Sequence, residues 1–248
     1  MMYMKPDTNA HGIPFISKDY IDDFCSNLIS RFEPSVLSRL HPVNIEQFVQ
    51  RCLGCRLRYE YLSCDGSILG ASMFKDTDAF PIYDPQRRQT VYTRARQGTV
   101  FIDKGLTAAD KNNLCRFTLA HEAGHMLWHG MYIGEKAKVS KEEPYLMCTS
   151  SDVASAARLH KHEKLSSTAL VERQANRSAS ALLMPKEAVL KLIASIGECR
   201  NRNDATNRIL CTASLFRVSC TAARMRLTEL GLINPILLST QSRSRHSA

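Results

Sequence analysis

The hydrophobic positions of this chain follow a helical spacing towards both ends and alternate in between. Residues 17–32 form an amphipathic pattern that stops before a proline, which predicts a first helix. Asn44, with Gln47 three residues later, is a helix-start signal, so we expect a second helix over 45–53 that Gly54 closes. The N-terminal part is therefore expected to be helical.

Short alternating segments follow, and they predict strands. An Asp65-Gly66 pair, a typical hairpin turn, separates the first two. We expect a small antiparallel sheet in which the last strand, 99–103, or a close neighbour lies at an edge beside the cleft, where it offers unpaired amides to an extended peptide. The expected strands are 56–62, 67–74, 80–83, 90–93 and 99–103.

The second half of the chain returns to a helical spacing. Thr107 with Asp110 three residues later resembles a capping box, and an uninterrupted pattern runs on to Gly130, so we expect one helix over 108–130. The whole order of elements predicts an α+β fold. Further helices are expected over 172–185, 186–196 and, as a pair around Val218-Ser219, 205–232, with a short linker at 197–204 and a disordered tail at 239–248.

The strongest candidate site lies inside the helix expected over 108–130. His121 and His125 are four residues apart, so both imidazoles lie on one helix face and can reach one ion. Two neutral nitrogens at this spacing suit Zn²⁺, and the intervening Glu122 can accept a proton from a zinc-bound water. The preceding run 116–120 is apolar enough to be buried, where ionisable side chains without a metal would be costly. The pattern predicts a zinc site with Glu122 as general base.

A tetrahedral zinc site needs a further protein ligand downstream. Glu172 is favoured, because the small residues Ala175 and Ala179 on its helix face would let a second helix approach closely. Asn176, one turn on, could support a ligand through a hydrogen bond. The alternative for Glu172 is an exposed glutamate at a helix start. Other ligand candidates are His129, which its spacing places at the helix end, the loop residues His160 and His162, and Glu163; an oxyanion donor is expected from Tyr132, Tyr145 or a histidine.

Three blocks of sequence carry a family resemblance. They are RFTLAHEAGH at 116–125, the segment from ERQAN to LLMP at 172–185, and LFRVS at 215–219 leading into ARMRL at 223–227. In this order they resemble the ImmA/IrrE family of zinc peptidases, over roughly residues 17–235. The family consists of small metallopeptidases that cleave helix-turn-helix transcriptional repressors, in stress responses or on mobile elements.

The resemblance implies a fold, a set of site residues and a partner. It implies a zincin-like core with a short antiparallel sheet and metal-bearing helices, and a helix-turn-helix repressor as the protein substrate. Its residue roles make His121, His125 and Glu172 the zinc ligands and Glu122 the general base. The expected organisation is a tail at 1–16, a peptidase domain at 17–198, a helix-turn-helix-like region at 199–238 and a tail at 239–248.

One departure from the family lies between the second and third ligands. Forty-seven positions separate His125 from Glu172, where family members often have a shorter connection, so residues 136–168 are expected to be an insertion near the cleft. Its weak periodicity predicts a mobile segment that could restrain access to the zinc. Cys148 within it could approach the metal as an inhibitory thiolate, because zinc accepts sulfur readily. The alternative is a surface loop without a role.

Composition and charge change this picture only slightly. The net charge of +9 is uneven: residues 1–130 carry 15 basic and 14 acidic side chains, whereas residues 131–248 carry 18 and 10. A basic half favours binding of nucleic acid or of an acidic partner, or is a plain solvated surface.

Residues 1–12 lack the apolar run of a signal peptide, no stretch is long enough to span a membrane, and the nine cysteines are irregularly spaced. We therefore expect a reduced cytoplasmic chain, in which the lone CxxC at 52–55 forms a turn.

The C-terminal helices support a competing function. An apolar helix, a turn at 217–219 and a second helix carrying Arg224 and Arg226 resemble a helix-turn-helix, with both arginines projecting outwards. A DNA- or protein-binding transcriptional regulator that retains a metal site without proteolysis is thus the alternative to a peptidase.

Overall fold

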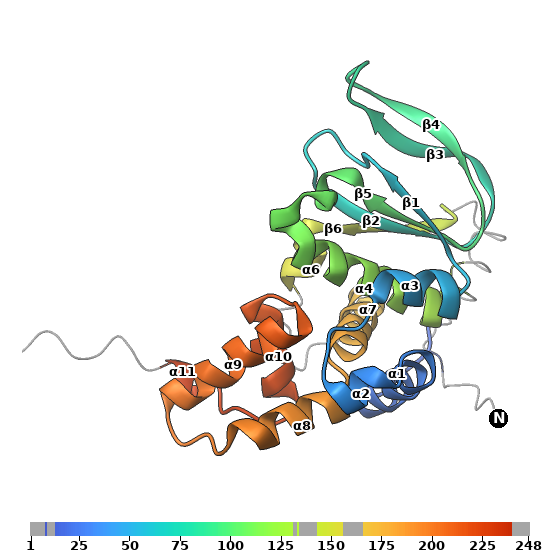
Figure 1. The fold of residues 1–248 in the computed structure, drawn as a ribbon. Coiled ribbons are helices and arrows are strands. Elements are labelled where there is room, and N and C mark those ends of the chain that lie inside the picture. The colour runs from blue at the N-terminus through green and yellow to red at the C-terminus, as the bar shows by residue number, and fades with distance from the viewer. Residues whose placement is uncertain (1–7, 9–12, 131–132, 134–142, 156–165, 240–248) are drawn as a thin grey trace, which may run out of the picture.

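A small sheet packs against one side of a group of helices (Figure 1). The computed structural model describes residues 8, 13–130, 133, 143–155 and 166–239. The mixture of helices with small sheets agrees with the expected combination of α and β structure. The helices are α1 (Lys18–Phe32), α2 (Ser35–Arg39), α3 (Ile45–Gln47) with a π turn at Phe48–Cys52, α4 (Asn112–Trp128), α6 (Ser150–Ser155), α7 (Ser167–Leu183), α8 (Lys186–Ile196), α9 (Arg202–Phe216), α10 (Cys220–Glu229) and α11 (Ile236–Ser239).

The strands form two separate sheets. A four-stranded sheet has the order β1-β5-β2-β6, in which β1 and β5 are parallel and the other neighbours are antiparallel. A second sheet consists of the hairpin β3–β4 alone. The strands are β1 (Arg56–Glu60), β2 (Ile68–Met73), β3 (Thr77–Asp84), β4 (Gln89–Ala95), β5 (Thr99–Asp103) and β6 (Tyr145–Thr149).

The pairing of these strands corrects three expectations. The main sheet is mixed rather than antiparallel, because β1 and β5 run parallel. The turn at Asp65-Gly66 does not close a hairpin, because β5 lies between β1 and β2 and pairs with both. For the same reason β5 is an interior strand, and all five of its residues are buried, so the expected edge position at 99–103 was wrong. An interior strand that is covered on both faces no longer alternates, and its length and composition do not reveal its partners.

The edge beside α4 is instead formed by β6, which lies within the expected insertion. Residues 145–149 pair with β2, and α6 follows directly at Ser150. The segment 136–168, expected as a mobile insertion, thus contains regular structure over 145–155, and its strand completes the main sheet. Residues 134–142 and 156–165, which include His160, His162 and Glu163, lie outside the described residues.

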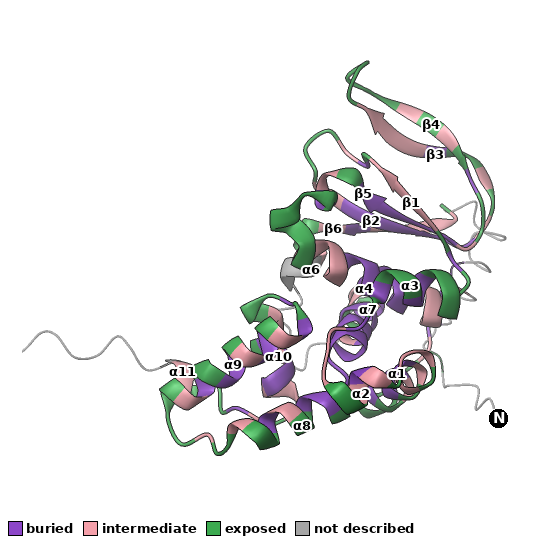
Figure 2. Ribbon diagram, viewed as in Figure 1, coloured by how far each residue is buried: buried purple, intermediate pink, exposed green. Residues whose placement is uncertain are grey.

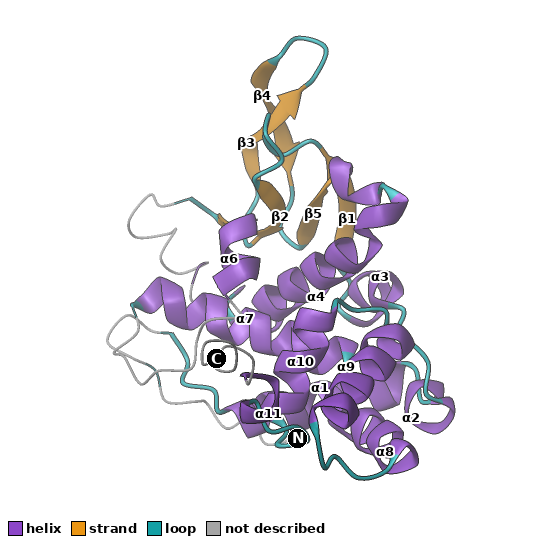
Figure 3. Cartoon of the chain, turned by 90° about the vertical axis from the view of Figure 1, so that its left-hand side faces the viewer, coloured by secondary structure: helices purple, strands orange, loops and turns teal. Residues whose placement is uncertain are grey.

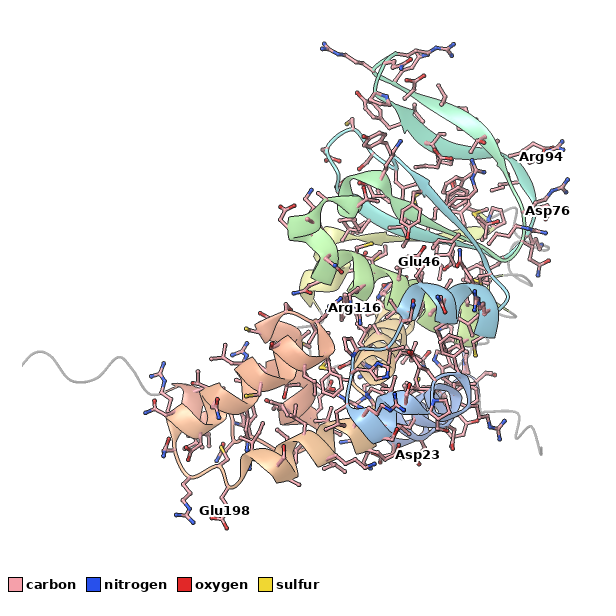
Figure 4. All side chains as sticks on the ribbon, in the orientation of Figure 1. Asp23, Glu46, Asp76, Arg94, Arg116 and Glu198 are labelled. Carbon is pink, nitrogen blue, oxygen red and sulfur yellow. The ribbon has the colours of Figure 1, made fainter. Side chains whose placement is uncertain are left out.

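The hairpin β3–β4 stands away from the other strands (Figure 3). The Phe80 ring stacks on that of Phe101 in β5, with 4.3 Å between the ring centroids, which attaches the hairpin to the main sheet. Figure 4 shows Arg94 in β4 and Asp76 just before β3, with both side chains pointing away from the rest of the molecule. These charges are paired with neighbours on the same hairpin, and the pairs are exposed.

Local start signals predicted some helix boundaries and failed at others. Ser17 caps α1, Asn44 caps α3, and α8 has the expected bounds. The expected capping box was wrong: the Thr107 hydroxyl donates to the Lys104 carbonyl, and α4 begins only at Asn112, after two short 3₁₀ turns. The helix that carries Glu172, α7, begins at Ser167 rather than at 172.

The C-terminal helices α9 and α10 meet at a turn over 217–219, as expected. Arg116 of α4, labelled in Figure 4, donates from Nε to the Arg217 carbonyl oxygen at 3.2 Å and connects this turn to α4. Arg224 is exposed, but Arg226 is fully buried, so the expectation that both project outwards was wrong. Arg226 donates to Asp22 in α1 at 2.7 Å and to the Met184 carbonyl oxygen at 3.1 Å.

One large hydrophobic cluster connects most elements. It extends from Ile29 in α1 through Leu119 in α4 and Leu182 in α7 to Phe216 and Leu227 in the C-terminal helices. Figure 2 shows the crossing of α4 and α7 as buried. Within the described part of the chain, no helix combines the length and the apolar character that a membrane crossing requires. The tail after Ser239 lies outside the described residues.

Candidate metal centre

The candidate site lies where α4 crosses α7, and the crossing is unusually close. A Cβ atom added at Gly124 would lie 2.9 Å from the Cα atom of Ala175 and 3.0 Å from Cβ of Ser178. Real Cβ atoms do not approach backbone so closely, so only glycine fits at this position. The expectation that small residues on α7 allow a close approach is confirmed, and the partner residue on α4 is Gly124.

Three donor atoms of the predicted ligands converge at this crossing. The Nε2 atoms of His121 and His125 lie 2.9 Å apart, and the Glu172 carboxylate oxygens lie 3.2 Å from the first and 3.5 Å from the second. Tetrahedral zinc with bonds of about 2.0–2.2 Å holds its ligand atoms about 3.3 Å apart. Both histidines are fully buried, and Glu172 is one turn into α7, facing them.

The hydrogen bond at the Nδ1 atom of each ring determines whether its converging Nε2 atom carries a proton or a lone pair. The Asn176 amide nitrogen donates to the Asp152 carbonyl oxygen, so its Oδ1 atom faces His121 Nδ1 at 2.9 Å and accepts that ring's proton. The Nε2 atom of neutral His121 then presents a lone pair towards His125 and Glu172. The predicted supporting role of Asn176 agrees with this contact.

A second chain of hydrogen bonds orients His125. The Gln174 amide nitrogen donates to the Pro14 carbonyl oxygen at 2.7 Å, so its Oε1 atom accepts from His129 Nε2 at 2.9 Å. The Nδ1 atom of His129 is then the acceptor for His125 Nδ1–H at 3.0 Å. Burial lowers the pKa of His129 to about 3, with the neighbouring His125 acting in the same direction, so the ring stays neutral.

These two networks bring two lone pairs and a carboxylate together in a buried space. Three acceptors this close repel one another unless a cation lies between them. Burial lowers the pKa of His125. Burial also lowers that of His121, but Cys148, Glu172 and Glu122 outweigh it, and the net pKa is raised well above the ordinary value, so without a metal ion a proton on Nε2 takes the place of the cation. Burial would raise the pKa of Glu172, but its contacts with the two histidine rings outweigh burial and lower it. The donor set therefore fits a divalent cation.

The predicted base, Glu122, is held against β2. Its Oε2 atom accepts a hydrogen bond of 2.6 Å from the Ser72 hydroxyl, whereas its Oε1 atom is buried without a hydrogen-bond partner. A Cβ atom at Gly70 would lie 2.7 Å from this Oε1 atom, so glycine leaves room for the carboxylate. Burial raises the Glu122 pKa to about 7, against the opposing effects of His121 and Ser72. A carboxyl group with a pKa near neutrality suits general acid–base chemistry.

The sequence pattern missed three contributors to the site. These are Ser72, Gln174 and the orienting role of His129, of which Ser72 and Gln174 follow only from contacts between distant segments. For His129 a signal existed: it lies four residues after His125, on the face that carries both histidines. Among the described residues, possible metal donors gather in two groups of three, His121–His125–Glu172 and His121–Glu122–Cys148, and the CxxC at 52–55 belongs to neither.

Neither tyrosine expected as an oxyanion donor is assigned that role by a contact in the structure. Tyr132 lies outside the described residues, and the Tyr145 ring packs edge-on against Phe80.

No protein-family model matches this sequence, and no curated protein matches it. The ImmA/IrrE resemblance therefore depends on the three sequence blocks alone.

Proposed function

We propose that this chain is a zinc-dependent endopeptidase of the ImmA/IrrE type, which cleaves a helix-turn-helix transcriptional repressor. The observation that carries the proposal is the convergence of the His121, His125 and Glu172 donor atoms beside the buried carboxylate of Glu122. The metal and the hydrolytic chemistry follow from this donor set. The repressor substrate and the release of repressed genes follow from the sequence resemblance.

Each residue of the site has a task in peptide hydrolysis. A zinc ion held by the two histidines and Glu172 would polarise the scissile carbonyl and lower the pKa of its water to about 7. Glu122 accepts the proton of the attacking water and passes it to the leaving amine. Ser72 holds the Glu122 carboxylate in place, and Asn176 and His129 fix the orientation of the two imidazoles.

The edge strand β6 offers a binding site for the substrate backbone. Among the described residues no strand pairs with its outer side, and it lies next to the residues of α4 that carry the site. An extended peptide that adds to such an edge gains main-chain hydrogen bonds without sequence specificity. We propose that the scissile segment binds there, with its carbonyl oxygen towards the metal position between His121, His125 and Glu172.

The substitution Glu122→Gln tests the peptidase activity. The amide cannot take up the proton, so cleavage should fall by at least about 10²–10⁴-fold. Zinc content should not change, because Glu122 is not one of the three proposed ligands. The substrates are unfolded casein and a panel of purified helix-turn-helix repressors, and the control is Glu187→Gln on the exposed side of α8. Equal cleavage by wild type and Glu122→Gln would refute the proposal.

The competing function, a DNA-binding regulator, has lost part of its basis. Of the two arginines expected on the outer face of α10, Arg226 is bound to Asp22 inside the molecule. A mobility-shift assay over a range of salt separates the two functions, because non-specific binding by basic residues falls steeply as salt rises. Sequence-specific binding that persists at physiological salt would favour the regulator.

A further inference from the structure

A second group of metal-type donors overlaps the first. Donor atoms of His121, Glu122 and Cys148 lie within 4.8 Å of one another, and all three residues are fully buried. The group shares His121 with the proposed zinc site but replaces one imidazole and Glu172 by a thiol and the carboxylate of the proposed base. Neither Cys148 nor Glu122 has a role as a zinc ligand in the proposed function.

The register of the sheet explains why the thiol faces the carboxylate. Cys148 in β6 is paired directly with Gly70 in β2. Directly paired residues have their side chains on the same face of a sheet. The missing side chain of Gly70 would point at Glu122 Oε1, so Cys148 faces the same helix, α4. The thiol and the carboxylate therefore meet in a space that Gly70 leaves open.

Both groups in this space have unused binding capacity. Glu122 Oε1 is buried and has no hydrogen-bond partner, which is costly unless something binds there. The Cys148 thiol makes a long donation of 3.8 Å to the Thr149 carbonyl oxygen and also lies within hydrogen-bonding reach of His121. A sulfur, a carboxylate oxygen and an imidazole nitrogen together form a donor set that soft metal ions prefer over nitrogen and oxygen donors alone.

We propose that His121, Glu122 and Cys148 form a second, overlapping position for a thiophilic divalent ion such as Cd²⁺. His121 Nδ1 is committed to Asn176, so only its Nε2 atom can bind a metal, and the two positions exclude each other. Binding forms bonds from the ion to nitrogen, oxygen and sulfur, releases the thiol proton to solvent, and displaces the zinc ion. If the chain is a peptidase, the ion also occupies its base, so the inhibitory consequence depends on the proposed function, whereas the binding does not.

Titration of the zinc-loaded full-length chain with Cd²⁺ tests the proposal. The exposed thiols of Cys52, Cys64 and Cys220 would also bind cadmium, so all variants carry serine at these three positions. The readouts are the ultraviolet charge-transfer band of a cadmium–thiolate bond, the zinc released to a chromophoric indicator, and the number of metal ions per chain. We expect one cadmium ion to enter, one zinc ion to leave, and the thiolate band to appear in step.

Substitutions assign the band to its residue. Cys148→Ser should abolish the band and weaken Cd²⁺ binding by at least about tenfold, since even residues that only support a ligand contribute about 10–100-fold. Its zinc affinity should stay within about twofold of wild type. Cys55→Ser, which removes a buried thiol elsewhere, is the matched control and should keep the band. Cys148→Ala provides the same test if the serine variant does not fold.

Two outcomes would overturn the proposal. One is a thiolate band that persists in both Cys148 variants. The other is cadmium that binds in addition to zinc, which two positions sharing His121 do not allow. Glu122→Gln gives an independent check, because it should weaken Cd²⁺ binding while leaving zinc content unchanged. None of these readouts requires proteolysis, so loss of the peptidase proposal would leave the result interpretable.

Discussion

The close crossing of α4 and α7 makes Gly124→Ala a sharp test of how the metal centre is built. The added Cβ atom would lie 2.9 Å from the Ala175 Cα atom and 3.0 Å from the Ala175 carbonyl oxygen. Carbon atoms are in favourable contact from about 3.5 Å, so the helices have to separate by about 0.5 Å. Because Ala175 is three residues after Glu172, the carboxylate moves away from His121 and His125 with its helix.

The magnitudes follow from this displacement. Metal–ligand distances tolerate about 0.2 Å, so a shift of about 0.5 Å should lower zinc affinity about 10–100-fold, or about 1.4–2.7 kcal/mol. Overpacking costs about 1–3 kcal/mol in the free energy of unfolding, and replacing a helical glycine by alanine returns about 1 kcal/mol. The metal-free variant should therefore lose only about 0–2 kcal/mol of stability, so its main defect is in metal binding.

Competition with a chromophoric chelator measures the zinc affinity, and urea unfolding of the metal-free chain measures the stability. Gly130→Ala is the matched control: its Cβ atom would meet the Phe74 ring at an ordinary 3.6 Å, so both quantities should remain those of wild type. The reasoning is refuted if Gly124→Ala binds zinc within about twofold of Gly130→Ala.

Three further predictions concern individual side chains. Glu172→Ala should release zinc under mild chelation that leaves wild type loaded, and retention of zinc as tight as in wild type would assign the third ligand to another residue. His129→Leu removes the acceptor of the His125 proton and should lower zinc affinity about 10–100-fold, whereas His129→Gln, which can still accept, should retain more; equal affinities would show that His129 only fills space. Asp22→Asn leaves the Arg226 guanidinium buried without its direct carboxylate partner and should cost about 3–5 kcal/mol in urea unfolding, against less than about 1 kcal/mol for Asp78→Asn in an exposed pair; similar losses would contradict the burial argument.

The features that the sequence determined are those that depend on residues close together in the chain. Helical spacing placed His121, Glu122 and His125 on one helix face, because the α-helix repeats every 3.6 residues whatever surrounds it. The same rule correctly placed Asn176 one turn from Glu172. Cap residues such as Ser17 and Asn44 acted through hydrogen bonds to amides three residues away, so these helix starts were also predictable.

Only the tertiary structure decided which distant segments meet. The Gln174 side chain reaches Pro14, and Arg226 reaches Asp22, across contacts that no local pattern encodes. Likewise, β5 lies between β1 and β2, and β6 places Cys148 beside the proposed base, Glu122. The alternation along a strand indicates which face is buried but not which strand pairs with it. The presence of a charged residue does not indicate whether it has an ion-pair partner in the interior. The two histidines of the candidate site were therefore readable from their spacing, whereas Ser72 and Gln174, which hold or orient the site residues, were not, because their contacts depend on long-range packing.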